Sequence, residues 1–385
     1  MHSSGEFQAA KAGSLLKGRV AFDEENISFY PFKPFDNRLA YLSNDIQPLF
    51  SRPSPELLET KRIPGNVFFL TRDAADKSAE GRPFYFSPYI CDYDFLSGHA
   101  RHFPIFTSSV KGGGAQSGLF DTADGAVVAN LSKRARAYLD TLGKTDYDES
   151  ADTASLVWLH ALAIGYAPEY LKENADGIGQ DWPRIPLPAD AEGLERSAGL
   201  GRQIAALLDT ESPVPGVTSG KTKDELRVIG SVSAVGDVGL DESRGDFALT
   251  VGWGYGGRVT MPGRGKAVRR DYTPDELKAL EAGTKVRGVT LEGVLGQLGP
   301  ATFDVYLNEK AYWRNVPENV WAYTIGGYQV VKKWLSYREK DVLGRPLTSD
   351  EAREVTHMTR RIAALLLLGV RLDANYERVK GAAHP

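Results

Sequence analysis

The chain has 385 residues, of which 42% are hydrophobic and 25% charged, and 46 Lys and Arg against 50 Asp and Glu give it a formal net charge of −4. These fractions exclude a disordered or fibrous protein, and the longest apolar run, Ile362 to Val370, is too short to span a membrane. A single Cys excludes a disulfide framework and a cysteine-built zinc site, and because the first residues lack a signal-peptide core we expect a cytoplasmic protein.

The first part of the chain, residues 1–213, has a mixed α/β pattern. Residues 20–110 are rich in aromatic residues and Pro, and their short apolar runs predict strands and irregular loops. Residues 130–143, 155–165 and 200–209 carry apolar residues at helical spacing and predict helices. Between the last two, the prolines of 182–188 exclude a helix and predict an extended crossing.

A second part, 214–326, begins at the Ser-Pro-Val-Pro-Gly boundary of 212–216. Apolar and polar residues alternate in 225–235, 246–261 and 302–308, which predicts strands and a β-rich part. We interpret the remainder, 327–385, as a helical tail with one helix over 328–340 and a longer one over 349–379, N-capped by Ser349. The sequence therefore predicts an α+β fold.

One basic segment points to nucleic acid. Between residues 258 and 270 the chain has no acidic residue and contains five cations: Arg258, Arg264, Lys266, Arg269 and Arg270. A run of cations is often only a solvated face, but this one lies beside glycines and predicted strands, where a basic loop could follow a phosphate backbone. Arg also suits bidentate contact with guanine. We therefore predict that these five residues contact DNA, and that the second cluster, Lys133, Arg134 and Arg136, is solvated.

Several apparent motifs lack the context that their chemistry needs. The glycines of 252–257 precede a segment that cannot begin a helix, and 216–222, which a strand is expected to follow, is one residue short of a phosphate-binding loop. We interpret His99 and His102 as loop residues, His160 as a hydrogen-bonded core residue and Pro274–Lys278 as a helix start. No Pro-Pro dipeptide is present for an adenine-methyltransferase loop. The sequence therefore argues against an independent enzyme.

Aromatic residues mark two predicted scaffold regions. Tyr30, Phe32, Phe35 and Tyr41 are expected to pack under a Pro-rich loop that an Asp36–Arg38 pair fixes. Farther along, a second group is expected to dock the β-rich part onto the tail, with Gly326-Gly327 as a strand-to-helix turn. The members of this second group are Trp321, Tyr323, Tyr328 and Trp334.

Several segments in order resemble one family. They are Tyr30–Leu42, Leu49–Glu59, Asn66–Arg72, His102–Phe106, Leu156–Pro188 and Val316–Glu351. Together they are similar to the C-terminal specificity region of type ISP restriction-modification enzymes, single polypeptides with a nuclease, a helicase-like ATPase, an N6-adenine methyltransferase and a target recognition domain. The family usually has His-Ser before the Pro-Glu-Tyr of 168–170, which this chain lacks.

The resemblance implies a chain that recognises a sequence in double-stranded DNA and contains no catalytic, cofactor or metal site of its own. It also implies a methyltransferase domain or subunit elsewhere that binds S-adenosylmethionine. Two alternatives stay open. The chain could be a protein-interaction or scaffold subunit of a defence complex that does not read DNA, or a stand-alone nuclease or methyltransferase, against which the missing motifs argue.

Overall fold

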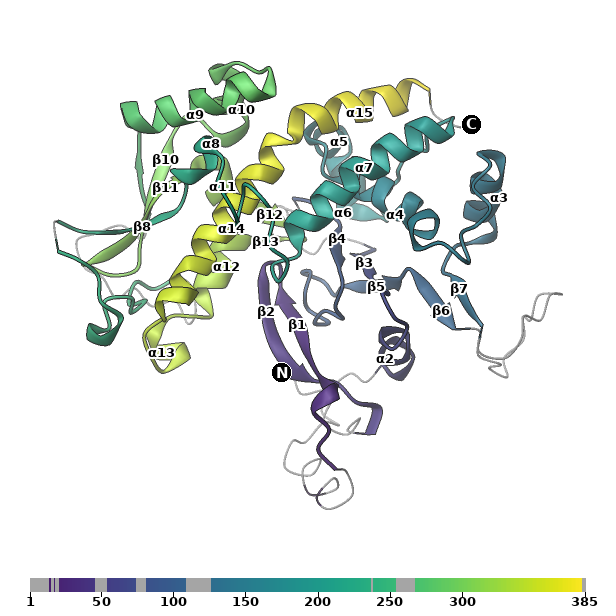
Figure 1. Cartoon of the computed structure of the whole chain (residues 1–385), viewed down its shortest axis with the longest axis horizontal. Helices are drawn as coiled ribbons and strands as arrows, with labels where there is room; N and C mark the ends of the chain where they lie inside the picture. Colours follow the sequence, from purple (N-terminus) through teal and green to yellow (C-terminus); the bar gives the residue numbers. More distant parts are fainter. Residues whose placement is uncertain are drawn as a thin grey trace.

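The computed structural model describes residues 14, 17, 21–45, 54–73, 81–108, 126–236, 238–253 and 267–382. Within these residues, small antiparallel sheets and helices pack against one another without the strand–helix alternation of a parallel sheet (Figure 1). The predicted α+β class is therefore confirmed. No described helix is both long and apolar enough to cross a membrane.

The first part of the chain forms short antiparallel strands. These are β1 (Ile27–Lys33), β2 (Asp36–Tyr41), β3 (Phe68–Thr71), β4 (Tyr85–Ser87), β5 (Arg101–Pro104), β6 (Phe106–Ser108) and β7 (Val127–Ala129). β1 pairs with β2, β3 lies between β4 and β5, and β6 pairs with β7. The strand-and-loop prediction for 20–110 is confirmed, apart from a one-turn 3₁₀ helix η1 (Glu24–Asn26) and the short helix α2 (Pro55–Lys61), which it did not include.

Helices follow, including the three that helical periodicity predicted. They are α3 (Lys133–Thr141), α4 (Ala151–Gly165), α5 (Pro168–Glu173), α6 (Ala175–Gln180) and α7 (Ala191–Leu208). Ser132, Ser150 and Asp190 cap α3, α4 and α7 because each side-chain oxygen accepts a hydrogen bond from the amide three residues later. The predicted helices are confirmed, and residues 182–187 form neither helix nor strand, as their prolines require.

The close packing of α4 against α7 depends on a glycine. A Cβ atom at Gly201 of α7 would overlap the carbonyl oxygen of Leu159 in α4. The absence of a side chain at this position therefore lets the two helix backbones approach each other.

The middle part builds a four-stranded antiparallel sheet in the order β8-β11-β10-β9. Its strands are β8 (Ser231–Ala234), β9 (Ala267–Arg270), β10 (Thr302–Tyr306) and β11 (Ala311–Pro317). The same part also contains α8 (Asp224–Arg227), the 3₁₀ helix η3 (Glu242–Arg244), α9 (Pro274–Arg287), α10 (Leu291–Leu298) and α11 (Glu318–Trp321). As described, the middle part is thus mixed rather than β-rich, and a helix, not the expected strand, follows residues 216–222.

The strand prediction for 246–261 is wrong over its described residues, 246–253, which form no strand. Asn308 explains why, since its side-chain amide donates to the carbonyls of Asp246 at 2.9 Å and Ala248 at 2.7 Å. The amides of Thr250 and Val251 both donate to the carbonyl of Leu307. These bonds hold the backbone in an irregular loop although its residues alternate as in a strand.

The tail begins with a two-stranded hairpin and continues as helices. Its elements are β12 (Thr324–Ile325), β13 (Tyr328–Gln329), α12 (Val330–Ser336), α13 (Lys340–Leu343), α14 (Ser349–Leu367) and α15 (Gly369–Gly381). Gly326 and Gly327, with φ values of 50° and 79°, form the hairpin turn and not the predicted strand-to-helix turn. Two residues with positive φ are what a two-residue hairpin turn needs.

The predicted long helix over 349–379 is two helices, α14 and α15, that meet at Leu368. Its N-cap is Thr348 and not Ser349. The Thr348 hydroxyl accepts from the amide of Glu351 at 3.2 Å, and the Glu351 carboxylate accepts from the amide of Thr348 at 2.8 Å. This reciprocal capping box needs a hydroxyl three residues before the Glu, and Thr348 has that position.

Helix α14 is the element that joins the parts. It contacts α7 on one side and β8, β11, α8, α10, α11 and α12 on the other, and it runs between the four-stranded sheet and α7 (Figure 1). Buried apolar residues from all three predicted parts, such as Phe95, Trp313 and Ile362, belong to one connected core. The three predicted parts therefore share one hydrophobic core.

The aromatic groups pack only partly as expected. Asp36 is fully buried and pairs with Arg38 at 3.2 Å, as predicted, and also with Arg338 at 2.8 Å, which was not foreseen. Trp321 lies edge-on to Trp253 with 5.2 Å between the ring centres, and this contact lies within the middle part rather than between it and the tail. Tyr328 instead lies between two lysines near the β1–β2 hairpin.

Candidate nucleic-acid interface

The four-stranded sheet has one buried and one open face. On the buried face, Val305 and Trp313 are fully buried, and the Trp313 indole donates to the carbonyl of Ala352 in α14 at 2.9 Å. Cross-strand partners share a face, so the opposite face carries Arg314 and the Tyr306–Tyr312 pair, whose rings stack at 5.2 Å. This opposite face, which we call the open face, therefore carries polar and aromatic side chains, of which Arg314 is 45% exposed and Tyr306 is buried.

A charge network anchors the edge strand β9 to this face. Arg270 donates to both carboxylate oxygens of Glu276 at 2.8 and 2.9 Å, and to both of Asp304 at 2.8 and 3.0 Å. Arg314 donates to the same Glu276 carboxylate at 3.1 Å. Two carboxylates thus balance two guanidinium groups, and this network fixes β9 to both β10 and α9.

The ionisation of this network follows from its hydrogen bonds. Burial opposes the charged forms of Glu276 and Arg270. The hydrogen bonds from Arg270 nevertheless hold the pKa of Glu276 below its ordinary value. Burial likewise lowers the pKa of Arg270, and the bonds to Glu276 and Asp304 outweigh it and raise that pKa. The pair is therefore ionised at neutral pH.

The predicted DNA-contact residues divide into two groups. Arg258, Arg264 and Lys266 lie outside the described residues, so their prediction stays a prediction. Arg269 and Arg270 belong to β9, which directly follows that segment. Arg269 pairs with Glu318 of α11 at 3.2 Å and its side chain is 53% exposed, whereas Arg270, at 23%, has its charge balanced by the network. Arg270 therefore anchors the end of the basic segment.

Glu276 is a residue whose role the sequence did not reveal. The expected helix start at Pro274–Lys278 is confirmed, because Thr273 and Glu276 form a capping box at the start of α9. The same carboxylate also binds Arg270 and Arg314. The sequence signal for this role was that an acidic residue, Glu276, follows the basic segment 258–270 within a few residues.

The second basic cluster, on α3, divides in a similar way. Lys133 and Arg134 are exposed, as predicted. Arg136 is not merely solvated, because it pairs with Asp148 at 2.7 Å and donates to the carbonyl of Ala129 at 2.7 Å. These bonds tie α3 to β7.

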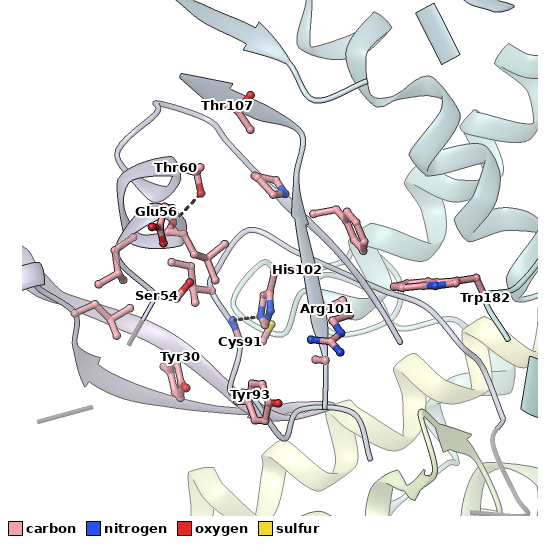
Figure 2. Close-up of a pocket in the computed structure, with 17 residues that line it drawn as sticks. Tyr30, Ser54, Glu56, Thr60, Cys91, Tyr93, Arg101, His102, Thr107 and Trp182 are labelled. Carbon is pink, nitrogen blue, oxygen red and sulfur yellow. Dashed lines mark hydrogen bonds between the residues drawn. The ribbon is translucent and has the colours of Figure 1, made fainter. Parts of the chain in front are cut away.

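A cavity of about 750 Å³ lies between α2, β5 and the loop around Cys91. Figure 2 shows Tyr30, Tyr93, His102 and Trp182 around it. His102 Nε2 accepts from the backbone amide of Cys91 at 3.2 Å, and burial lowers the pKa of His102 to about 4. Burial also raises the pKa of the Cys91 thiol. The imidazole is thus neutral with its basic nitrogen engaged and the thiol is protonated, so these two groups form no nucleophile–base pair.

His102 lies in strand β5 and not in a loop, so that interpretation is wrong, whereas His160 and His99 lie where they were expected. His160 is fully buried, with Nδ1 at 2.7 Å from the Ser197 hydroxyl and Nε2 at 2.8 Å from the carbonyl of Pro186. His99 lies in a loop and pairs with Asp94 at 2.8 Å. Over the part of the chain that the structure describes, no cluster of His, Cys, Asp and Glu could hold a metal ion.

Comparison with known proteins identifies a family. A family model described as the type ISP C-terminal specificity domain matches residues 5–365. The chain is similar in fold to a protein solved as a DrdV–DNA complex, with a TM-score of 0.53 and 16% identity over 95% of this chain and 30% of that one. It is also similar to the ATP-dependent type ISP restriction-modification enzyme LlaBIII bound to DNA, with a TM-score of 0.51 and 11% identity over 96% of this chain and 20% of that one. No curated protein matches the sequence.

Proposed function

This chain belongs to the family of type ISP C-terminal specificity domains, and on that basis we propose that it recognises the DNA target of a bacterial restriction-modification or phage-defence system. The family match over most of the chain is the observation that carries the proposal. The chain spans less than a third of the length of the two solved structures to which it is similar.

The arrangement of β9 supports this function. The segment with Arg258, Arg264 and Lys266 leads directly into β9, an edge strand of the described sheet. The Arg270 network holds that strand in place, so the basic segment has a fixed point of attachment. In our proposal the segment and the open sheet face enter the major groove, which admits a two-stranded β ribbon. Arg269, half exposed at the rim, would contact a phosphate.

The chemistry of the system would reside on a partner. We propose a methyltransferase domain or subunit that binds S-adenosylmethionine and modifies an adenine in the duplex that this chain positions. The target base would have to leave the stack to be methylated, and a recognition module would fix the duplex while it does so. The same role would place the chain in the cytoplasm together with its DNA.

A salt titration tests the proposed interface. We expect the wild-type chain to bind duplex DNA with an affinity that falls steeply between about 50 and 200 mM salt. Replacing Arg258, Arg264 and Lys266 by Ala should lower the affinity and reduce the magnitude of the log–log salt slope by about 2 to 3. The matched control replaces three exposed cations elsewhere, Lys172, Arg184 and Arg202, by Ala. Equal slopes for both triple variants would remove the basic segment from the interface.

A protein-interaction role is the second candidate, and one observation favours it. Phe22, Phe29 and Leu39 at the β1–β2 hairpin are 74%, 37% and 68% exposed. Neighbouring exposed apolar side chains often mark a protein interface. A stable complex with an adenine methyltransferase of the same genome, together with no affinity for any duplex at about 50 mM salt, would favour this function over DNA recognition.

A further inference from the structure

Cations and aromatic rings alternate where the β1–β2 hairpin meets α12 and the β12–β13 hairpin. We call this group the cation–aromatic ring. Its members are Phe32, Lys33, Arg38, Tyr328, Lys333 and Tyr337. They come from two segments almost 300 residues apart in the sequence, and these segments lie side by side in the fold, where α12 contacts β1.

The distances close the group into a cycle. Phe32 lies between Lys33 and Arg38, with its ring centre 4.6 and 4.1 Å from their charged groups. Tyr337 lies between Arg38 and Lys333, at 5.4 and 4.8 Å. Tyr328 lies between Lys333 and Lys33, at 5.1 and 5.2 Å. Every ring is thus within cation–π distance of two cations.

The positive charge of the cation–aromatic ring is only partly balanced. Lys33 lies 3.8 Å from Asp92, and Arg38 shares Asp36 with Arg338. Among the described residues, no carboxylate lies within ion-pair distance of Lys333.

The surroundings of Lys33 and Lys333 raise the free-energy cost of keeping both ammonium groups charged. Burial lowers the pKa of Lys333. Burial also lowers the pKa of Lys33; Asp92 and Asp94 oppose this shift, and Lys333 adds to it. Lys33 is buried and Lys333 half-buried, so the repulsion between their charges is stronger than in water, and a bound anion would relieve it.

Solvent can reach this group. The Arg38 side chain is 43% exposed, and Lys333, Phe32, Tyr328 and Tyr337 are half-buried. Lys33 is buried, and its ammonium group also donates to the carbonyl of Asp94. An anion that approached from solvent would therefore meet Arg38 and Lys333 first.

We propose that the cation–aromatic ring binds a phosphate of the DNA backbone at a second contact, separate from the basic segment 258–270. The inference rests on the proposed function and extends it to the N-terminal hairpin and α12. The alternative ligand, an unpaired base, needs an aromatic face on which to stack. Each of the three rings already has two cations near it, so a phosphodiester suits the group better.

Charge-neutralising variants test this contact on duplex DNA. Replacing Arg38 and Lys333 by Gln removes two charges and keeps polar side chains of moderate length. We expect affinity to fall about tenfold at low salt and the magnitude of the salt slope to fall by about 1 to 2. The loss should be equal for matching and scrambled duplexes, because a phosphate contact carries no sequence information. Lys332→Gln, exposed on the same helix but outside the cycle, is the control.

The outcomes separate this inference from the proposed function. A wild-type chain that binds a duplex, with a folded double variant of unchanged affinity and slope, would make the group purely structural and leave DNA recognition intact. A wild-type chain that binds no duplex would overturn both. If the double variant does not fold, amine labelling of the wild-type chain replaces it. A duplex should protect Lys333 but not Lys172, and equal labelling of Lys333 with and without DNA would overturn the inference.

Discussion

Two adjacent arginines of α14 satisfy carbonyl groups at the ends of other helices. Arg361, only 2% exposed, donates to the carbonyls of Ala206 and Leu207 in the last turn of α7 and to that of Ser212 beyond it. Arg360 donates to the carbonyl of Arg227 at the end of α8. The last carbonyls of a helix lack partners within the helix, and a cation there also complements the helix dipole.

Replacing Arg361 by Met should destabilise the fold by about 3 kcal/mol, because three carbonyls lose their donor and the bond to Leu207 is buried. Arg353→Met on the same helix is the control, since Arg353 is 61% exposed and pairs with the exposed carboxylate of Asp350. We expect that control to change the free energy of unfolding by at most about 0.5 kcal/mol. Urea denaturation measures both, and equal losses would contradict the structural role of Arg361.

Buried His160 should make stability depend on pH. Burial lowers the pKa of His160 from 6.5 to about 4. Between these two values the unfolded chain binds a proton that the folded chain does not, so stability is complete above the unfolded pKa and falls as pH drops towards the folded one. A shift of this size corresponds to about 3 kcal/mol. His102, with a pKa also of about 4, adds to the same interval.

His160→Gln should remove one of the protons that unfolding takes up in this interval. The measurement is the free energy of unfolding in urea at several pH values between about 7 and 4. Asp246, whose hydrogen bonds from Lys310 and Arg244 lower its pKa to about 2, loses its contribution only at lower pH, so it does not interfere. A variant with the same pH dependence as wild type would contradict the assignment.

At the scale of elements, the α4–α7 contact depends on one position. Gly201→Ala would place a methyl group against the Leu159 carbonyl, so α7 must move or the core must loosen. We expect a loss of about 2 to 4 kcal/mol. Gly199→Ala, two residues away on the same helix, meets no atom within 4 Å and should stabilise the helix by up to about 1 kcal/mol. Thermal denaturation compares the two, and a Gly201→Ala chain as stable as wild type would disprove the close contact.

Helical periodicity located α3, α4 and α7, and each of these helices begins after a capping residue that the sequence shows. The start of α9 was located by its Thr-Pro-Asp-Glu signal instead. The alternation of apolar and polar residues was a less reliable signal for strands. Residues 246–253 alternate like a strand, but Asn308, some 60 residues later, holds their carbonyls in a loop. Helical periodicity also continues through Leu368, so periodicity alone does not mark the break between α14 and α15.

Over the whole molecule, links between distant segments define both the fold and the candidate interface. Asp36, near the start, pairs with Arg338, and the cation–aromatic ring joins the same two regions. The charge run at 258–270 could be found in the sequence. The charge network that anchors this segment could not be found in the sequence, because Asp304 and Arg314 join the network only after β9, β10 and β11 pair. The cation–aromatic ring depends in the same way on tertiary contacts.

We propose that this chain alone reads a DNA sequence. The decisive experiment is selection from a library of random duplexes at about 150 mM salt, followed by sequencing of the bound fraction. We expect enrichment of one short motif, bound at least about a thousandfold more tightly than a scrambled duplex. A bound fraction with the base composition of the starting library, or no bound fraction, would overturn this proposal.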